Sequence, residues 1–337
     1  MSPPIAMDAD LPRVQKPFLT SNKPDTGFLS SQFDSAKHIA FASPSTTLRM
    51  EDLGLESTAL SSVATTEPFP LLSHESVIQH RRELFSDAVL DNCLHHTRPG
   101  SVQLRGMAPR YCTIHPQLVP ALDYEIAHTN VQLGPGGVEG VKTTPEAKAK
   151  DAIVTDQAKP IIEWHRDSHP FVCVVMLSDA RFMAGGETEL MKGDGSTLKV
   201  KAPQMGCAVL LQGRYITHTA APVTNMPERV TIVTSFRPKD PTMLDEMTNA
   251  NIRNKSHLSE LYYQWTTYRL DVLAARARIA ADALRKQYDE NVQSSDPEGQ
   301  SGLCRVDTVD YAAMQKWANE QLEYIQQTLY EMRPLDQ

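Results

Sequence analysis

The chain has 337 residues, with 33 basic and 41 acidic side chains and a formal net charge of −8. This length is enough for one large domain with extensions, or for two domains. A net-acidic chain without a basic patch argues against nucleic acid as a partner. Its apolar runs are shorter than the ~20 residues that a membrane-spanning helix needs, so we expect no membrane partner.

Cysteine usage and the first residues both favour a cytoplasmic protein. The five cysteines are odd in number, widely spaced and without a C-x-x-C pair. That pattern indicates reduced thiols and not a disulfide framework or a zinc site. Met1–Ala6 has neither the basic nor the apolar region of a secretory signal, so none is expected.

The part of the chain before His128 divides into an irregular segment and a helical segment. Residues 1–70 are rich in Pro, Ser, Thr and Asp, which predicts an extended N-terminal segment. Its scattered phenylalanines suggest that it wraps over the later domain. Residues 71–127 are predicted to form helical support for that domain. Ser73 is placed to cap a helix that ends by Thr97–Gly100, and a second helix is expected near Pro116–Ile126.

Residues 128–240 have the character of short strands. Seven or eight apolar, β-branched runs are separated by turn residues, a pattern typical of a barrel or sandwich and not of alternating strands and helices. In the first run, His128, Asn130 and Gln132 fall on one face, because side chains alternate along a strand. With helices before and after, the chain is predicted to have an α+β fold.

Residues 241–337 are predicted to form a C-terminal helical extension. Apolar residues recur at steps of three and four from about Ser256 to Val292, and again from Tyr311 to Met332, with a linker at Ser294–Gly299. One apolar stripe on each helix suits either of two arrangements. In the first, the two helices pack on the predicted barrel. In the second, they form an arm through which two copies of the chain make a homodimer.

The clearest chemical signal is His165-Arg166-Asp167, followed much later by His218 on another β-branched run. In an extended strand, His165 and Asp167 point to the same side and Arg166 points away. Two imidazoles and one carboxylate on one side of a metal leave its opposite side open. This donor set is the facial triad of non-haem Fe(II) oxygenases.

His169 is an alternative ligand, because His165, Asp167 and His169 alternate along the same stretch. It precedes Pro170 at an expected bend, which favours His218 as the third ligand. No nucleophile arrangement of the Ser-His-Asp or Cys-His kind is evident. We therefore expect no catalytic side chain beyond the metal ligands.

The order of these motifs resembles the 2-oxoglutarate/Fe(II)-dependent oxygenase superfamily. The resemblance covers roughly residues 128–238 and lies in the H-x-D pair, the buried run 171–177, the turn Gly185-Gly186-Glu187-Thr188, His218 and Arg229. It implies a double-stranded β-helix, also called a jelly roll or cupin-like core, over 128–240. It also implies Fe(II) on His165, Asp167 and His218, with 2-oxoglutarate and O2 as cosubstrates and ascorbate as a candidate accessory factor.

The same resemblance assigns cosubstrate-binding residues. Arg229 matches the basic residue that pairs with the distal carboxylate of 2-oxoglutarate, and Thr231 matches the hydroxyl residue that often follows. A guanidinium suits this role because it forms two parallel hydrogen bonds with a carboxylate. Asn130 and Gln132 are candidates for further hydrogen bonds to the cosubstrate, although ordinary polar strand positions explain them as well.

Substrate is the least specified part of the prediction. Arg214, Tyr215 and Phe236 are candidate substrate contacts because they lie near the ligand strands in sequence. The chain is similar to fungal members of the superfamily that act on amino acids or secondary-metabolite intermediates, which implies hydroxylation, desaturation or ring closure of a small molecule. The alternatives are a peptide hydroxylase resembling the prolyl hydroxylases, and a non-catalytic jelly-roll binding module.

Overall fold

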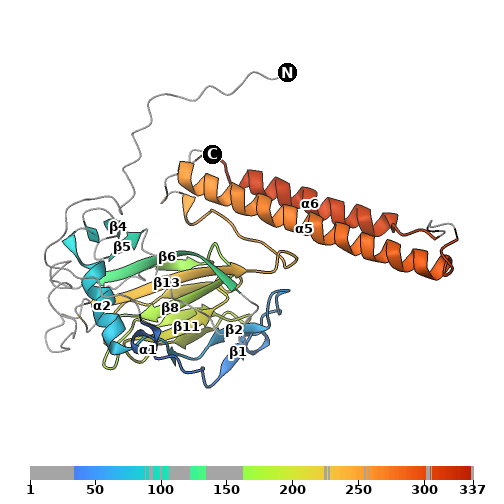
Figure 1. The fold of residues 1–337 in the computed structure, drawn as a ribbon. Helices are drawn as coiled ribbons and strands as arrows, with labels where there is room; N and C mark the ends of the chain where they lie inside the picture. The colour runs from blue at the N-terminus through green and yellow to red at the C-terminus, as the bar shows by residue number, and fades with distance from the viewer. Residues whose placement is uncertain are drawn as a thin grey trace, which may run out of the picture. The chain divides into compact units, whose positions relative to one another are not determined.

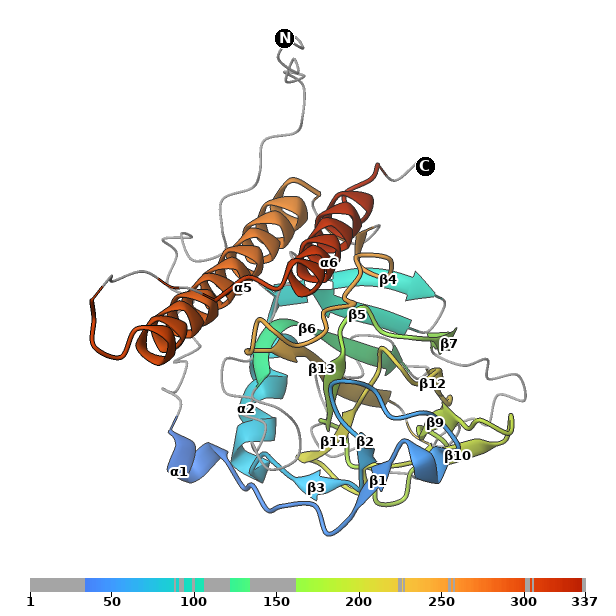
Figure 2. The same cartoon turned by 90° about the vertical axis from the view of Figure 1, so that its right-hand side faces the viewer.

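The protein is described by a computed structural model in which two antiparallel sheets and flanking helices make an α+β fold (Figures 1 and 2). This is the fold class that the sequence predicts. Closure of the sheets into a double-stranded β-helix stays a prediction. The structure describes residues 34–87, 89–90, 94–98, 101–105, 122–133, 162–223, 226, 228–253, 256, 258–300, 304 and 306–334.

Among the described residues, the larger sheet has nine strands, each antiparallel to its neighbours. Two of its central strands, Phe171–Met176 and Cys207–Leu211, are apolar and almost wholly buried, as expected for strands covered on both sides. In spatial order the strands are β1 (Thr47–Arg49), β2 (Val63–Thr66), β11 (Cys207–Leu211), β8 (Phe171–Met176), β13 (Glu228–Pro238), β6 (Leu122–Leu133), β5 (Ser101–Arg105) and β4 (Leu94–Arg98), and β3 (Phe69–Pro70) pairs with β11.

The smaller sheet has four strands, in the order β10 (Thr197–Val200), β9 (Thr188–Met191), β12 (His218–Ala220) and β7 (Ile162–His165). Its inner face packs on one face of the larger sheet through a shared apolar cluster. Leu190 and Val200 of the smaller sheet meet Val172, Val209 and Leu211 of the larger one in this cluster. Burying apolar side chains from both sheets is the main force that holds the layers together.

The opposite face of the larger sheet carries a second apolar cluster, which includes Val77 and Leu84 of α2 (His74–Leu84). Ser73 caps α2 as predicted, because its hydroxyl accepts the N–H of Ser76. Arg81 on the buried side of α2 forms an ion pair with Glu228 at 2.7 Å and donates to the carbonyl of Leu177. These contacts fix the start of β13, which is the strand that carries Arg229.

Three expectations for the N-terminal part of the chain need correction. The predicted helical segment 71–127 contains strands as well, since the helix that Ser73 caps ends at Leu84 and β4, β5 and the start of β6 follow. Part of the N-terminal segment is regular structure and not only extended chain, since it contains α1 (Ser35–His38), the 3-10 turn η2 (Glu51–Leu53) and three strands of the larger sheet. The second predicted helix is also wrong for its last residues, because residues 122–126 belong to β6. Pairing with β13 along the whole of β6 overrides the local helical pattern there. Residues 1–33 and 106–121 lie outside the described part.

The C-terminal extension is a hairpin of two antiparallel helices, α5 (Leu258–Ser295) and α6 (Tyr311–Tyr330), as predicted (Figures 1 and 2). Buried Arg269 joins them to the preceding segment: its Nη1 lies 3.0 Å from Asp245 and its Nη2 donates to the carbonyl of Tyr324. One flank of the hairpin therefore packs on the rest of the chain. None of the described helices combines the length and apolarity of a membrane span.

Candidate metal centre and cosubstrate pocket

Three side chains from two distant parts of the sequence meet at the inner face of the smaller sheet. β7 and β12 are neighbours, and their pairing sets His165 directly opposite His218. Asp167 lies two residues beyond the end of β7, where its N–H donates to the carbonyl of Gly213 at 2.9 Å. The strand pairing and this one backbone hydrogen bond bring the predicted H-x-D…H residues together.

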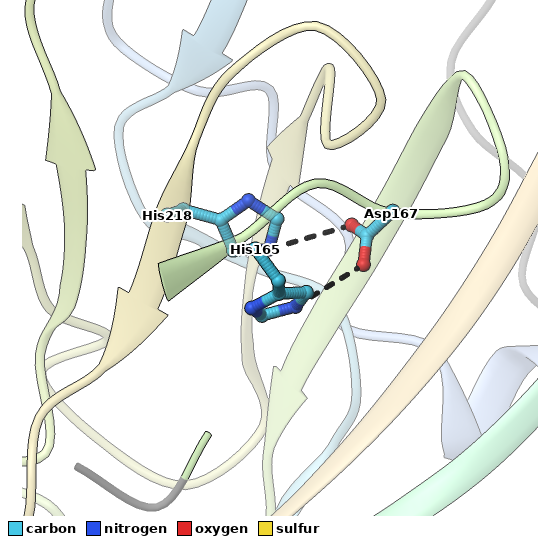
Figure 3. Close-up of side chains that lie close together, drawn as sticks. All are labelled: His165, Asp167 and His218. Carbon is cyan, nitrogen blue, oxygen red and sulfur yellow. Dashed lines mark ion pairs between the residues drawn. The ribbon is translucent and has the colours of Figure 1, made fainter. Parts of the chain in front are cut away.

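The ligand atoms of this triad converge on one point (Figure 3). His165 Nε2 lies 3.5 Å from Asp167 Oδ1, and His218 Nε2 lies 3.4 Å from Asp167 Oδ2. All three ligand atoms fall within 4.8 Å of one another. His169 is not in this cluster, so the structure brings His218 and not His169 to the H-x-D pair.

The backbone fixes which nitrogen of each imidazole is available. His165 Nδ1 lies 2.7 Å from the carbonyl of Glu163, and His218 Nδ1 lies 2.9 Å from the carbonyl of Ile216. A carbonyl only accepts, so each Nδ1 carries a proton, and in the neutral form of each ring Nε2 carries the lone pair and faces the cluster. Outer hydrogen bonds of this kind are what orient histidine ligands in metal sites.

Asp167 supplies the charge of the cluster. Burial raises its pKa, but the contacts with His218 and His165 lower it by more, so the group is a carboxylate at neutral pH. Burial lowers the pKa of His218, against the opposing charge of Asp167. Asp167 Oδ2 is buried and accepts no hydrogen bond. A buried, unsatisfied carboxylate oxygen beside two nitrogen lone pairs is the environment that a divalent cation stabilises, so the residues fit a metal.

Gly213 leaves the space that the carboxylate of Asp167 occupies. A Cβ atom built at Gly213 would overlap Asp167 Oδ2. We therefore expect Gly213→Ala to displace the carboxylate and weaken Mn(II) binding by about tenfold or more, as loss of an orienting contact typically does. Calorimetry measures this, with Arg214→Ala in the same turn as the control. Unchanged metal affinity in Gly213→Ala would show that Asp167 is not held in this way.

A second group of predicted residues lies in a pocket between the sheets. Arg229 and Thr231 of β13 line it, together with Thr188 of β9. Arg229 is 4% exposed, its Nε donates to the carbonyl of Gly186 and its Nη1 to Thr231 Oγ1. Burial lowers its pKa to about 10, against the opposing charge of Glu187. The remaining lining residues are Val174, Met176, Gly186, Val200, Ala202 and Val209.

The pocket and the triad lie on the same face of the smaller sheet. Thr188 and Leu190 lie on one face of β9, and Leu190 is the residue opposite His218. Within the described part of the chain, no carboxylate lies within ion-pair distance of Arg229, since the ion pairs formed there all involve other residues. A buried guanidinium without a counter-ion favours an anionic ligand.

Asn130 and Gln132 lie on the neighbouring strand, directly opposite Thr231 and Arg229. Asn130 is thus on the face that borders the pocket, but Gln132 is engaged elsewhere, since its amide both donates to and accepts from the backbone of Val223. These two hydrogen bonds indicate a structural role for Gln132.

His128 is a residue that the sequence prediction did not include in the site. It shares its face of β6 with Asn130, and its Nε2 lies 3.4 Å from the Asn130 amide. Its charge also influences the pKa of both Asp167 and His169, which places it near the triad. The alternation of side chains along β6 indicates this position, because it puts His128 on the same strand face as Asn130 and Gln132.

Of the three predicted substrate contacts, Phe236 is not brought to the triad. Phe236 is buried in the apolar cluster on the opposite face of the larger sheet, paired with Phe171. The ring of Tyr215 packs against both apolar clusters, and burial together with the charge of Glu246 raises the pKa of its hydroxyl. Arg214 lies in the same turn, half-buried. The prediction of Phe236 as a substrate contact was wrong. Phe236 is close to the ligand strands in sequence, but strand alternation points its side chain to the other face of the sheet.

No family model and no curated protein matches the chain. Similar solved structures include an oxidoreductase of the 2OG-Fe(II) oxygenase family from Burkholderia pseudomallei, with 16% identity over 34% of this chain and 43% of that chain at a TM-score of 0.24. A Pseudomonas putida prolyl-4-hydroxylase matches with 18% identity over 34% of this chain and 53% of its own, at 0.21. A rice dioxygenase for auxin oxidation matches with 16% identity over 37% and 39%, at 0.23. The chain thus spans about half or less of these structures.

Proposed function

We propose that the chain is an Fe(II)- and 2-oxoglutarate-dependent oxygenase that acts on a C–H bond of a small molecule. The observation that carries the proposal is the convergence of His165 Nε2, His218 Nε2 and the unsatisfied Asp167 Oδ2 on one point. Two neutral imidazoles and one carboxylate are the donor set that proteins use for non-haem Fe(II) with open coordination positions.

Each triad residue has a distinct task in this proposal. His165 and His218 donate lone pairs whose direction is set by the carbonyls of Glu163 and Ile216. Asp167 contributes the negative charge, and its buried position keeps water from competing for Oδ2. When bound, Fe(II) with 2-oxoglutarate and O2 supplies oxidation of a substrate C–H bond, with release of succinate and CO2.

The cosubstrate assignment rests on Arg229. Its buried guanidinium lies in a pocket with mostly apolar walls and two threonine hydroxyls, Thr188 and Thr231. In this proposal one carboxylate of 2-oxoglutarate, a linear dianion, pairs with Arg229 while the other end reaches toward the triad. Excluding water from the pocket strengthens that ion pair.

The substrate class is proposed from the sequence resemblance, which favours an amino acid or a secondary-metabolite intermediate and leaves hydroxylation, desaturation and ring closure open. The experiment is a screen of metabolite fractions for substrate-dependent succinate release by the protein with Fe(II), 2-oxoglutarate and O2. We expect at least one small-molecule fraction to stimulate release, and Asp167→Ala to give none. Stimulation by peptides alone would favour the peptide hydroxylase, and no stimulation by any fraction would favour a binding module.

A further inference from the structure

The hairpin formed by α5 and α6 has a flank that faces away from the rest of the chain. Trp265 Nε1 donates to the carbonyl of Thr328, and Arg269 Nη2 donates to the carbonyl of Tyr324, so the two helices run antiparallel in a fixed register. Tyr268 and Tyr324 both reach Asp245, which marks the flank that packs inward. The side chains on the opposite side of each helix form the outer flank.

The outer flank of α6 is apolar although it is exposed. Leu322, Ile325 and Leu329 follow one another at steps of three and four, and they are 56%, 39% and 62% exposed. Ala318 and the 77%-exposed Tyr311 continue the same stripe toward the start of the helix. A stripe of this spacing and length on a helix whose opposite side is already packed favours a second packing partner.

The outer flank of α5 lies beside this stripe. It is also apolar and includes small side chains. Tyr263 and Leu270 are 66% and 56% exposed, and Ala274 and Ala277 continue the stripe at helical spacing. Small residues let a neighbouring helix approach closely. The two stripes together make one apolar face, which we call the outer hairpin face (Tyr263, Leu270, Ala274, Ala277, Tyr311, Ala318, Leu322, Ile325 and Leu329).

Charges border the outer hairpin face in a self-complementary order. Along the edge of α5 that lies away from α6, Asp271 is in the N-terminal half and Arg278 is in the C-terminal half, one on each side of Ala274. Within the described part of the chain, neither Asp271 nor Arg278 forms an ion pair, as the pairs found on α5 involve other residues. An antiparallel copy of α5 crossing near Ala274 would set each Asp271 against an Arg278.

The two-fold axis that would relate the two copies of α5 would also relate the two copies of α6. The exposed stripe of α6 from Tyr311 to Leu329 is centred near Glu320, and the register fixed by Arg269 and Tyr324 places that centre beside the Asp271–Arg278 midpoint of α5. A single two-fold axis therefore pairs α5 with α5 and α6 with α6 of a second copy. Under it, Leu322 meets Ala318 and Leu329 meets Tyr311, so large side chains face smaller or flat ones.

We propose that the outer hairpin face binds a second copy of this chain to form a symmetric four-helix bundle. The contact is isologous, since the same patch serves both copies. Antiparallel four-helix packing around an apolar centre with charged edges is a stable arrangement for such hairpins. The helices would then have two roles, because the inward flank packs on Asp245 while the outward flank joins two copies.

The test is the mass of the full-length protein in sedimentation equilibrium, which we expect to be twice the 37.5 kDa of the chain. Asp271→Arg sets arginine against Arg278, and Arg278→Asp sets aspartate against Asp271. Each variant should weaken the dimer by about tenfold or more, because two symmetric attractions become repulsions. The double variant D271R/R278D restores both pairs and should restore the dimer. Glu323→Arg, an exposed reversal on α6 outside the face, is the control and should leave the mass unchanged.

A second variant tests the apolar part independently of charge. Leu322→Glu places a carboxylate at the centre of the outer hairpin face and should give a folded monomer with unchanged Mn(II) binding. A monomeric wild-type protein would overturn the proposal, as would a dimer that survives both Leu322→Glu and the single reversals. If the single reversals dissociate the dimer and the double variant does not restore it, the antiparallel register is wrong.

Discussion

Replacing Asp167, His165 or His218 by alanine is expected to abolish turnover and to weaken metal binding by more than about 100-fold, while the chain stays folded. Loss of an outer contact to a metal ligand typically costs 10–100-fold in affinity, and loss of a ligand itself should cost more. The fold should survive, because the triad's side chains are not part of either apolar cluster. Asp167→Ala even removes a buried oxygen that accepts no hydrogen bond.

Mn(II) binding followed by calorimetry measures this effect, and the far-ultraviolet spectrum shows whether each variant is folded. His169→Ala is the matched control, because His169 lies two residues from Asp167, is buried, and is outside the ligand cluster. Burial lowers the pKa of His169 to about 4, so its ring is neutral and contributes no charge to the metal. If His169→Ala lost the metal and His218→Ala retained it, the ligand assignment would be wrong.

Arg229→Ala is expected to weaken 2-oxoglutarate binding at least tenfold with little change in metal affinity. Truncating one partner of a buried, hydrogen-bonded charge pair typically costs ~2–5 kcal/mol, and each ~1.4 kcal/mol is a factor of ten. Arg229 is suited to such a pair because it is buried and its Nε is already held by the carbonyl of Gly186. Mn(II) should bind nearly as before, since Arg229 is not among the triad.

Three variants sharpen the Arg229 result. Arg229→Lys keeps the charge without the two-pronged geometry and should retain part of the affinity. Thr231→Val should cost less than Arg229→Ala, because a neutral hydrogen bond is worth only ~1 kcal/mol net. Arg181→Ala removes an exposed arginine paired with Asp179 and should have no effect. Equal 2-oxoglutarate affinity in Arg229→Ala and wild type would remove the cosubstrate from this proposal.

Strand alternation made much of the site predictable from sequence. It placed His165 and Asp167 on one side, and it put Asn130 on the strand face that borders the Arg229 pocket. Alternation alone does not place Asp167, since β7 ends at His165 and Asp167 is positioned by the carbonyl of Gly213. The residue types and their order were sufficient to predict where a side chain points wherever the strand is regular.

Contacts between distant segments explain what the sequence did not reveal. The N-terminal strands β2 and β3 pair with β11, which lies far later in the chain, and no local pattern indicates that pairing. Gly213 matters because of the carboxylate beside it, which becomes evident only once the strands are assembled. Phe236 was selected for its place near the ligand strands in sequence, whereas its pairing with Phe171 directs it into the core on the other face.

The measurement that tests the proposed function most directly is calorimetric titration of 2-oxoglutarate into the wild-type protein under argon, with and without Mn(II). If the triad holds the metal and Arg229 holds the far carboxylate, 2-oxoglutarate should bind at one equivalent per chain with Mn(II), and much more weakly without it. 2-Oxoglutarate binding should depend on the metal because the metal holds one end of the dianion and Arg229 holds the other. Either anchor alone leaves one end unbound. Binding that is absent in both titrations, or identical in both, would contradict an oxygenase of this kind.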